Sequence, residues 1–238
     1  MYWLVFATLV AFFVKGLCGF ANTLVFTSIL GFTTDNINIS PVEIVLGYPS
    51  NAILAWRERK HLNFKVWLPL ALMVLSGSIP GVFLLKNIHP KWIKITFGFA
   101  VIAMGVEMLL RNRIKQQAAK STTILFIIGI VSGVLCGIYG VGALLAAYVS
   151  RVTTTSNSFK ANLCLVFLIE NTFRIVLYLI TGIITLHTVQ QAFILLPVML
   201  LGLYLGIKSG SFLNESVAKK VVIVVLIISG AALIINNL

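Results

Sequence analysis

Apolar residues run along this chain in long tracts, and short polar segments rich in lysine and arginine separate these tracts. A hydrocarbon core of about 30 Å is crossed by roughly 20 helical residues. Tracts of about this length follow one another from end to end, so the pattern predicts an all-α, polytopic helical membrane protein with a single transmembrane domain over residues 1–238. The eight tracts are 2–32, 42–56, 66–85, 92–110, 122–149, 163–184, 189–206 and 217–235.

Two of these tracts, 2–32 and 122–149, are too long for one crossing. As single helices they would measure about 46 Å and about 42 Å, at 1.5 Å per residue. Glycines interrupt both tracts in the middle, within the segments GLCGFAN at 16–22 and GIYGVGA at 137–143. We therefore expect each tract to be either a broken crossing or a re-entrant hairpin.

The same features recur in two halves of the chain. Similar segments occur in the same order in the first and the second half of the chain. They predict two homologous halves, with repeat 1 over 1–115, a linker at 116–120 and repeat 2 over 121–238. The segments that begin at Gly77 and Gly202 have the small-residue spacing of close helix contacts. The aligned pairs are Gly19 and Gly140, Asn51 and Asn171, Gly77 and Gly202, Lys94 and Lys219, and Gly105 and Gly230.

The basic residues indicate how the two halves are oriented. If all eight tracts cross once, each side carries eight basic residues. If the first tract of each half enters and leaves on the same side of the membrane, thirteen basic residues lie on one side of the membrane and three lie on the other. Because basic loops face the cytoplasm, the second arrangement is favoured. The cytoplasmic loops would then be 57–65, 111–120, 150–160 and 208–220.

The predicted architecture is therefore two halves in inverted repeat, each with a broken or re-entrant first element and three transmembrane helices. Inverted repeats of this kind are typical of transporters, in which the binding site lies at the repeat interface. The pattern predicts a multi-pass protein of the cell membrane (plasma or inner membrane) with both termini outside.

Composition narrows the function classes. The chain is 59% hydrophobic and 10% charged, with a mean hydropathy of +1.04, which excludes a soluble or disordered protein. The net charge of +12 resides mostly in short loops, so we do not expect nucleic acid as a partner. The three cysteines lie in apolar tracts without metal-like spacing, and hydrolase and P-loop motifs are absent. We therefore expect neither an enzyme nor a bound metal or cofactor.

The glycine breaks are the first candidates for binding. A helix that restarts after a break directs free N–H groups and the positive end of its dipole at the membrane interior, which suits an anion. On this reading Gly19, Gly140 and Gly142 offer backbone donors to a substrate. The alternative is close helix packing through small residues.

Polar side chains near the breaks extend this candidate site. Lys15 would add positive charge, or would instead reach an interface or a carbonyl. Asn22 would donate its amide to an oxyanion, or would join helices. Asn51 and Asn171 occupy equivalent positions in the two halves, so symmetry would place them on opposite sides of one central site. A structural role in helix contacts remains open for both.

Glu170 and Arg174 stand four residues apart, so one helix face can pair them. Buried charges in membranes are usually paired or functional. We expect either an internal salt bridge or a coupling or proton-relay role for Glu170. Because Glu170 has this candidate partner, unpaired carboxylates appear scarce, and the sequence does not favour a transported cation.

The duplicated halves and their glycine breaks resemble the sulfite exporter TauE/SafE family of membrane proteins. The resemblance spans nearly the whole chain and rests on the segments 16–22 and 137–143. It implies secondary transport, with export favoured, of small sulfur-containing or carboxylate anions such as sulfite or organosulfonates. The chain departs from the family pattern in having Ala21 and Asn22 where a glycine run is usual.

The sequence thus predicts an anion transporter that works by alternating access. Its partners would be a small anion, the lipid bilayer and a coupling ion, either a proton or sodium; homo-oligomerisation stays open. The alternative is a non-transporting membrane subunit or assembly factor, in which the polar groups only hold helices together.

Cysteine accessibility tests the inverted topology. The model of two inverted halves places Asn38 outside and Arg113 in the cytoplasm. With the native cysteines replaced, single cysteines at these positions should react with a membrane-impermeant maleimide from opposite faces of the membrane. Labelling of both positions from one face would contradict the prediction.

Overall fold

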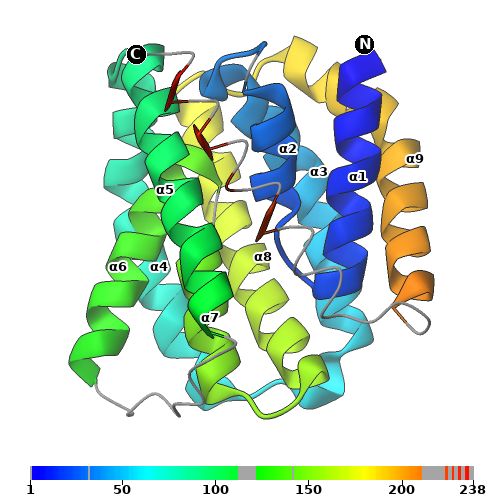
Figure 1. Ribbon diagram of the computed structural model, residues 1–238, viewed down its shortest axis with the longest axis vertical. Coiled ribbons are helices and arrows are strands. Elements are labelled where there is room, and N and C mark those ends of the chain that lie inside the picture. Colours follow the sequence, from blue (N-terminus) through cyan, green and yellow to red (C-terminus); the bar gives the residue numbers. More distant parts are fainter. Residues whose placement is uncertain are drawn as a thin grey trace.

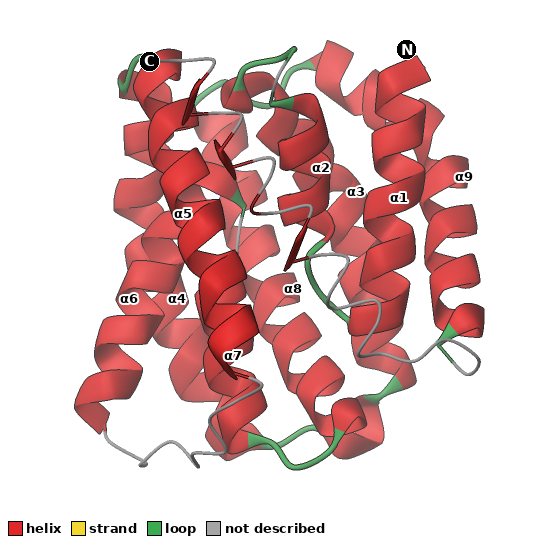
Figure 2. Ribbon diagram, in the orientation of Figure 1, coloured by secondary structure: helices red, strands yellow, loops and turns green. Residues whose placement is uncertain are grey.

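A computed structural model describes residues 2–31, 33–111, 122–140 and 142–210, together with 223–224, 227, 230–231 and 234–235. Over these residues every regular element is a helix, as Figure 2 shows, so the all-α class is confirmed. Asn38 lies in the first turn of a helix. Arg113, the linker 116–120 and Lys219 lie outside the described residues.

The described helices follow the order predicted from the first seven apolar tracts, and the eighth tract, 217–235, lies largely outside the described residues. In repeat 1 they are α1 (Tyr2–Cys18), α2 (Asn22–Leu30), α3 (Asn36–Arg57), the short 3₁₀ helix η1 (Arg59–His61), α4 (Phe64–Asn87) and α5 (Pro90–Arg111). In repeat 2 they are α6 (Thr122–Tyr139), α7 (Ala143–Val152), α8 (Ser156–Ile180) and α9 (Leu186–Ser209).

Three of the described helices, α4, α8 and α9, are long and apolar enough to cross a membrane. Two further apolar helices, α1 and the segment Phe126–Tyr139 of α6, are shorter. Helices α1 and α6 both end at a glycine break.

The two overlong tracts are broken within the glycine segments identified from sequence. Between α1 and α2 the backbone turns through left-handed conformations at Gly19 (φ +83°) and Ala21 (φ +73°). Between α6 and α7 the turn lies at Gly140 (φ +73°). Glycine adopts this conformation freely, whereas a residue with a Cβ pays about 1–2 kcal/mol. After its break, α2 packs back against α1 (Figure 1).

Helix packing is reciprocal between the two halves. Helix α1 packs along α9, and α6 packs along α4, while α3 and α8 meet between these pairs (Figure 1). In the predicted alignment, α1 corresponds to α6 and α4 to α9. Each half therefore lays its first helix on the second of the three predicted transmembrane helices of the other half. That the two halves are homologous and that they are inverted both stay predictions.

Glycines line both of these seams. A Cβ on Gly137 of α6 would lie 2.7 Å from the Cα of Gly81 in α4. A Cβ on Gly16 of α1 would lie 2.8 Å from the Cα of Gly206 in α9. The segments 77–81 and 202–206, predicted to make close helix contacts, lie in these seams. The helix backbones approach so closely because no side chain separates them.

The three cysteines are small core residues, as their setting in apolar tracts predicted. Cys18, Cys136 and Cys164 are all buried and form no disulfide. They belong to clusters of apolar side chains that fill the space between the helices.

Substitution of a seam glycine tests the packing. In Gly137→Ala the new Cβ would meet backbone atoms that cannot move aside, including the Ser78 carbonyl oxygen at 2.6 Å. We expect the free energy of unfolding to fall by about 1–3 kcal/mol, measured by denaturation in detergent. Gly210→Ala is the matched control, because its Cβ would meet no atom closer than 3.4 Å. Equal stability of both variants would contradict the close backbone approach.

Candidate functional site

The first helix break frees backbone carbonyls at the end of α1, and α8 supplies donors for them. The Lys160 ammonium donates to the Leu17 carbonyl oxygen over 3.0 Å, and the Cys164 thiol donates to the Gly19 carbonyl oxygen over 3.5 Å. The aliphatic part of Lys160 also packs on Gly19, where a Cβ would lie 2.6 Å from its Cγ. Helix α8 of repeat 2 thus closes the break in repeat 1.

The second break is closed in a corresponding way. The Asn36 amide of α3 donates to the Ile138 carbonyl oxygen over 2.6 Å. From α8, the Tyr178 hydroxyl donates to the Gly137 carbonyl oxygen over 3.3 Å, and the Arg174 guanidinium donates to that of Cys136. Irregular backbone at membrane depth requires such partners. The carbonyl ends of both breaks are therefore satisfied by side chains.

The N-terminal ends of the restarting helices are different, because their own N-cap residues do not cap them. Helix α2 begins after Ala21 and α7 begins after Gly142, and neither of these N-cap residues makes a side-chain hydrogen bond. The first N–H groups of a helix have no intrahelical acceptor. Two helix ends with free donors and positive dipole ends thus arise at the breaks.

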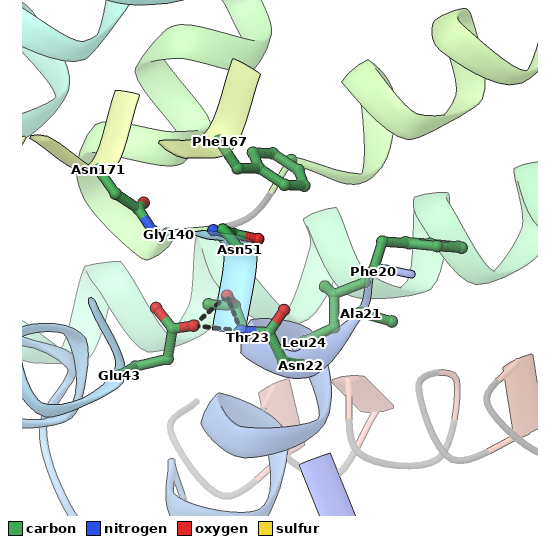
Figure 3. A pocket seen from close by; sticks show the side chains of 11 residues that line it. Phe20, Ala21, Asn22, Thr23, Leu24, Glu43, Asn51, Gly140, Phe167 and Asn171 are labelled. Carbon is green, nitrogen blue, oxygen red and sulfur yellow. Dashed lines mark hydrogen bonds between the residues drawn. The ribbon is translucent and has the colours of Figure 1, made fainter. Parts of the chain in front are cut away.

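Both of these helix ends border one pocket. The first break, α3, the second break and α8 all contribute to its walls, so it lies between the two halves (Figure 3). The lining residues are Phe20, Ala21, Asn22, Thr23, Leu24, Glu43, Asn51, Gly140, Gly142, Phe167 and Asn171.

Five of the seven residues proposed from sequence as substrate ligands line this pocket: Asn22, Asn51, Gly140, Gly142 and Asn171. The other two, Gly19 and Lys15, do not belong to its lining. Gly19 faces Lys160 instead. Lys15 is buried in the last turn of α1, with its ammonium 5.9 Å from the centre of the Phe12 ring.

The asparagines present different groups to the pocket. The Asn171 Oδ1 accepts a hydrogen bond from Arg174 Nη2 over 3.2 Å. This bond fixes the orientation of the Asn171 amide, which directs Nδ2 toward the pocket (Figure 3). Asn51 is 2% exposed, and its Oδ1 has no hydrogen-bond partner. An unpartnered buried polar atom in a pocket wall is available to a ligand.

Glu43 of α3 is a pocket residue that sequence reasoning missed. Its Oε1 accepts hydrogen bonds from Asn22 Nδ2 over 2.5 Å and from Thr23 Oγ1 over 2.7 Å (Figure 3). The expectation that unpaired intramembrane carboxylates are scarce was therefore too narrow. The signal was an acidic residue inside the apolar tract 42–56, but no basic residue stands one helical turn away to draw attention to it.

Glu170 and Arg174 form the ion pair that their spacing suggested. Arg174 Nε lies 3.2 Å from Glu170 Oε1, and both side chains are 1% exposed. The Ser78 hydroxyl donates to the same carboxylate over 3.2 Å. Gly140 lies between this pair and Glu43, because a Cβ there would be 2.9 Å from Arg174 Nη1 and 3.1 Å from Glu43 Oε2.

The site chemistry is that of hydrogen bonding and charge. Among the described residues, no group of three His, Cys, Asp or Glu side chains is placed to hold a metal ion. Free helix N–H groups, amides, a hydroxyl and a carboxylate can instead bind and release a small polar ligand.

Comparison with known proteins gives one match. The family model described as sulfite exporter TauE/SafE matches residues 4–233. No curated protein and no solved structure matches the chain. The family match therefore covers all of the pocket residues.

A double-mutant cycle tests the buried ion pair. Arg174→Gln leaves a buried carboxylate without its partner, so we expect the free energy of unfolding to fall by about 3–5 kcal/mol. Adding Glu170→Gln should recover part of this loss, because the unpaired charge disappears. Denaturation in detergent gives the four free energies of unfolding. Losses that simply add would contradict the coupling.

Proposed function

Because this chain belongs to the sulfite exporter TauE/SafE family, we propose that it is a secondary transporter that exports a small anion by alternating access. The anion would be a small sulfur-containing or carboxylate species, of the sulfite or organosulfonate type. The observation that carries this proposal is the pocket bordered by two uncapped helix N-termini, one from each half.

Electrostatics explains why such a pocket suits an anion. Each helix N-terminus carries about half a positive charge, and its free N–H groups donate hydrogen bonds. The Asn171 amide nitrogen adds a donor from α8 whose direction is held by Arg174. In a low-dielectric interior, fixed donors of this kind are worth more than in water.

The position of the pocket supports alternating access. Its walls come from the first break and α3 of one half, and from the second break and α8 of the other. Movement of the halves against each other would therefore open the pocket to one side and close it to the other. The reciprocal packing of α1 on α9 and α6 on α4 is consistent with two inverted units.

The same proposal includes the setting in the cell. The chain would lie in the plasma or inner membrane with its basic loops in the cytoplasm and both termini outside. The alternative of a non-transporting subunit would not need a polar pocket lined by both halves, so no observation favours it.

Transport assays in proteoliposomes test the function. We expect wild-type protein to carry ³⁵S-sulfite, and methanesulfonate and acetate serve as competing anions. Asn171→Ala removes a donor from the pocket and should slow sulfite flux about tenfold, as expected for a lost hydrogen bond to a charged group. Asn51→Ala tests the side of the pocket that α3 forms, in the same assay.

Asn87→Ala is the matched control, since Asn87 is exposed at the end of α4, outside the pocket. It should transport as wild type does. Normal flux in both Asn51→Ala and Asn171→Ala would remove these residues from the site. Absence of flux for every anion in wild type would favour the non-transporting alternative.

A further inference from the structure

Glu43 places a carboxylate in a pocket whose other features suit an anion. It is 2% exposed, and both of its hydrogen-bond donors, Asn22 and Thr23, belong to the first turn of α2. This is one of the two helix ends assigned above to the transported anion. Carboxylate and substrate would therefore use neighbouring donors, and two negative charges so close together repel.

The charges buried in the molecule make this conflict specific. Among the described residues, four charged side chains are buried: Lys15, Glu43, Glu170 and Arg174. Their formal charges cancel, so an added anion would leave one uncompensated negative charge in a low-dielectric interior. A single proton taken up together with the anion removes this excess.

Glu43 is better suited than Glu170 to take up that proton. Glu170 is held by its ion pair with Arg174 and by the Ser78 hydroxyl. Glu43 accepts its hydrogen bonds from neutral groups, and within the described part of the chain no ion pair holds it. It also lines the pocket, whereas Glu170 does not.

Other titratable groups face Glu43 from the surrounding helices, and their effects oppose one another. Arg174 and Lys15 favour its ionised form, whereas Glu170 favours its protonated form. Helix α2, which donates the hydrogen bonds, contains no titratable residue. The groups that interact with Glu43 electrostatically are Lys15 of α1, Cys136 of α6, and Glu170, Arg174 and Tyr178 of α8.

We propose that Glu43 carries one proton across the membrane together with each anion. This inference rests on the proposed transport function and names its coupling ion as the proton. Water on the loading side gives a proton to the Glu43 carboxylate, and the neutral carboxyl holds Asn22 and Thr23 less strongly. These donors turn to the incoming anion. After the halves move, the anion leaves and Glu43 returns its proton to water on the other side.

The cycle has an electrical consequence. A singly charged anion and one proton move with no net charge, so the membrane potential does not act on the cycle. Export proceeds when the outward gradient of the anion exceeds any inward gradient of protons. The empty protein returns with Glu43 ionised and its donors occupied again. A proton gradient imposed in the laboratory should in turn drive the anion in the same direction as the proton.

The test compares wild type with Glu43→Gln in proteoliposomes that contain the full chain. Glutamine keeps an acceptor oxygen for Asn22 and Thr23 but cannot exchange a proton. Accumulation of ³⁵S-sulfite is measured while the pH outside is 1 unit lower than the pH inside and valinomycin clamps the membrane potential. The uptake into empty liposomes is subtracted. Sulfite exchange is measured separately at equal pH on both sides.

Wild type should accumulate about tenfold more sulfite than Glu43→Gln. The reason is that, with one proton coupled to each anion, a pH difference of 1 unit supports a tenfold concentration gradient of the anion. The protonation of sulfite itself contributes equally to both proteins. Exchange by Glu43→Gln should stay measurable above that of empty liposomes, because exchange at equal pH requires no net movement of protons. Glu58→Gln removes a carboxylate outside the pocket, beside Arg57 and His61, and should accumulate sulfite as wild type does.

Two results would overturn the inference while leaving the transport function intact. In one, Glu43→Gln accumulates sulfite to the wild-type level. In the other, it folds but loses exchange as well, which would make Glu43 a structural acceptor. A wild type that moves no anion would overturn the transport function itself, and the inference with it.

Thr23→Val provides a second arm, should Glu43→Gln fail to fold. Loss of the Thr23 hydroxyl removes a hydrogen bond that favours the ionised carboxylate. Half-maximal sulfite uptake should then occur at a higher pH than in wild type. An unchanged pH profile would overturn the inference.

Discussion

Backbone groups freed at two helix breaks must find partners inside the membrane, and the rest of this structure depends on that requirement. Water is absent from the hydrocarbon core, so each unsatisfied carbonyl or N–H group costs several kcal/mol. The carbonyl ends are satisfied by Lys160, Asn36, Tyr178 and Arg174. The N–H ends remain without caps and border a pocket. One constraint therefore produces both a closed break and a pocket.

The donors also tie the two halves together. Lys160 of repeat 2 closes the break in repeat 1, and Asn36 of repeat 1 closes the break in repeat 2. Glycine seams reinforce this exchange, because α1 lies against α9 and α6 lies against α4. Any relative movement of the halves must alter the surroundings of both breaks, which places the pocket where such movement has most effect.

Charge is arranged around the same point. The pair of Glu170 and Arg174 anchors α8 to the second break, because the guanidinium also reaches the Cys136 carbonyl and the Asn171 amide. Glu43 lies on the other side of Gly140 and is held by neutral donors. Glycine is required at this turn both for its positive φ and because a Cβ would crowd these charged groups.

Hydrophobic periodicity and glycine placement determined much of this molecule before any fold was known. They gave the all-helical class, the breaks in the two long tracts and the Glu170–Arg174 pair, because these depend on spacing along one helix or tract. Tertiary structure alone decided that Asn22, Asn51 and Asn171 share a pocket, and that Lys15 and Gly19 do not line it. It also brought Glu43 to Asn22 and Thr23 across 20 residues of sequence, since contacts between helices depend on packing that no local pattern specifies.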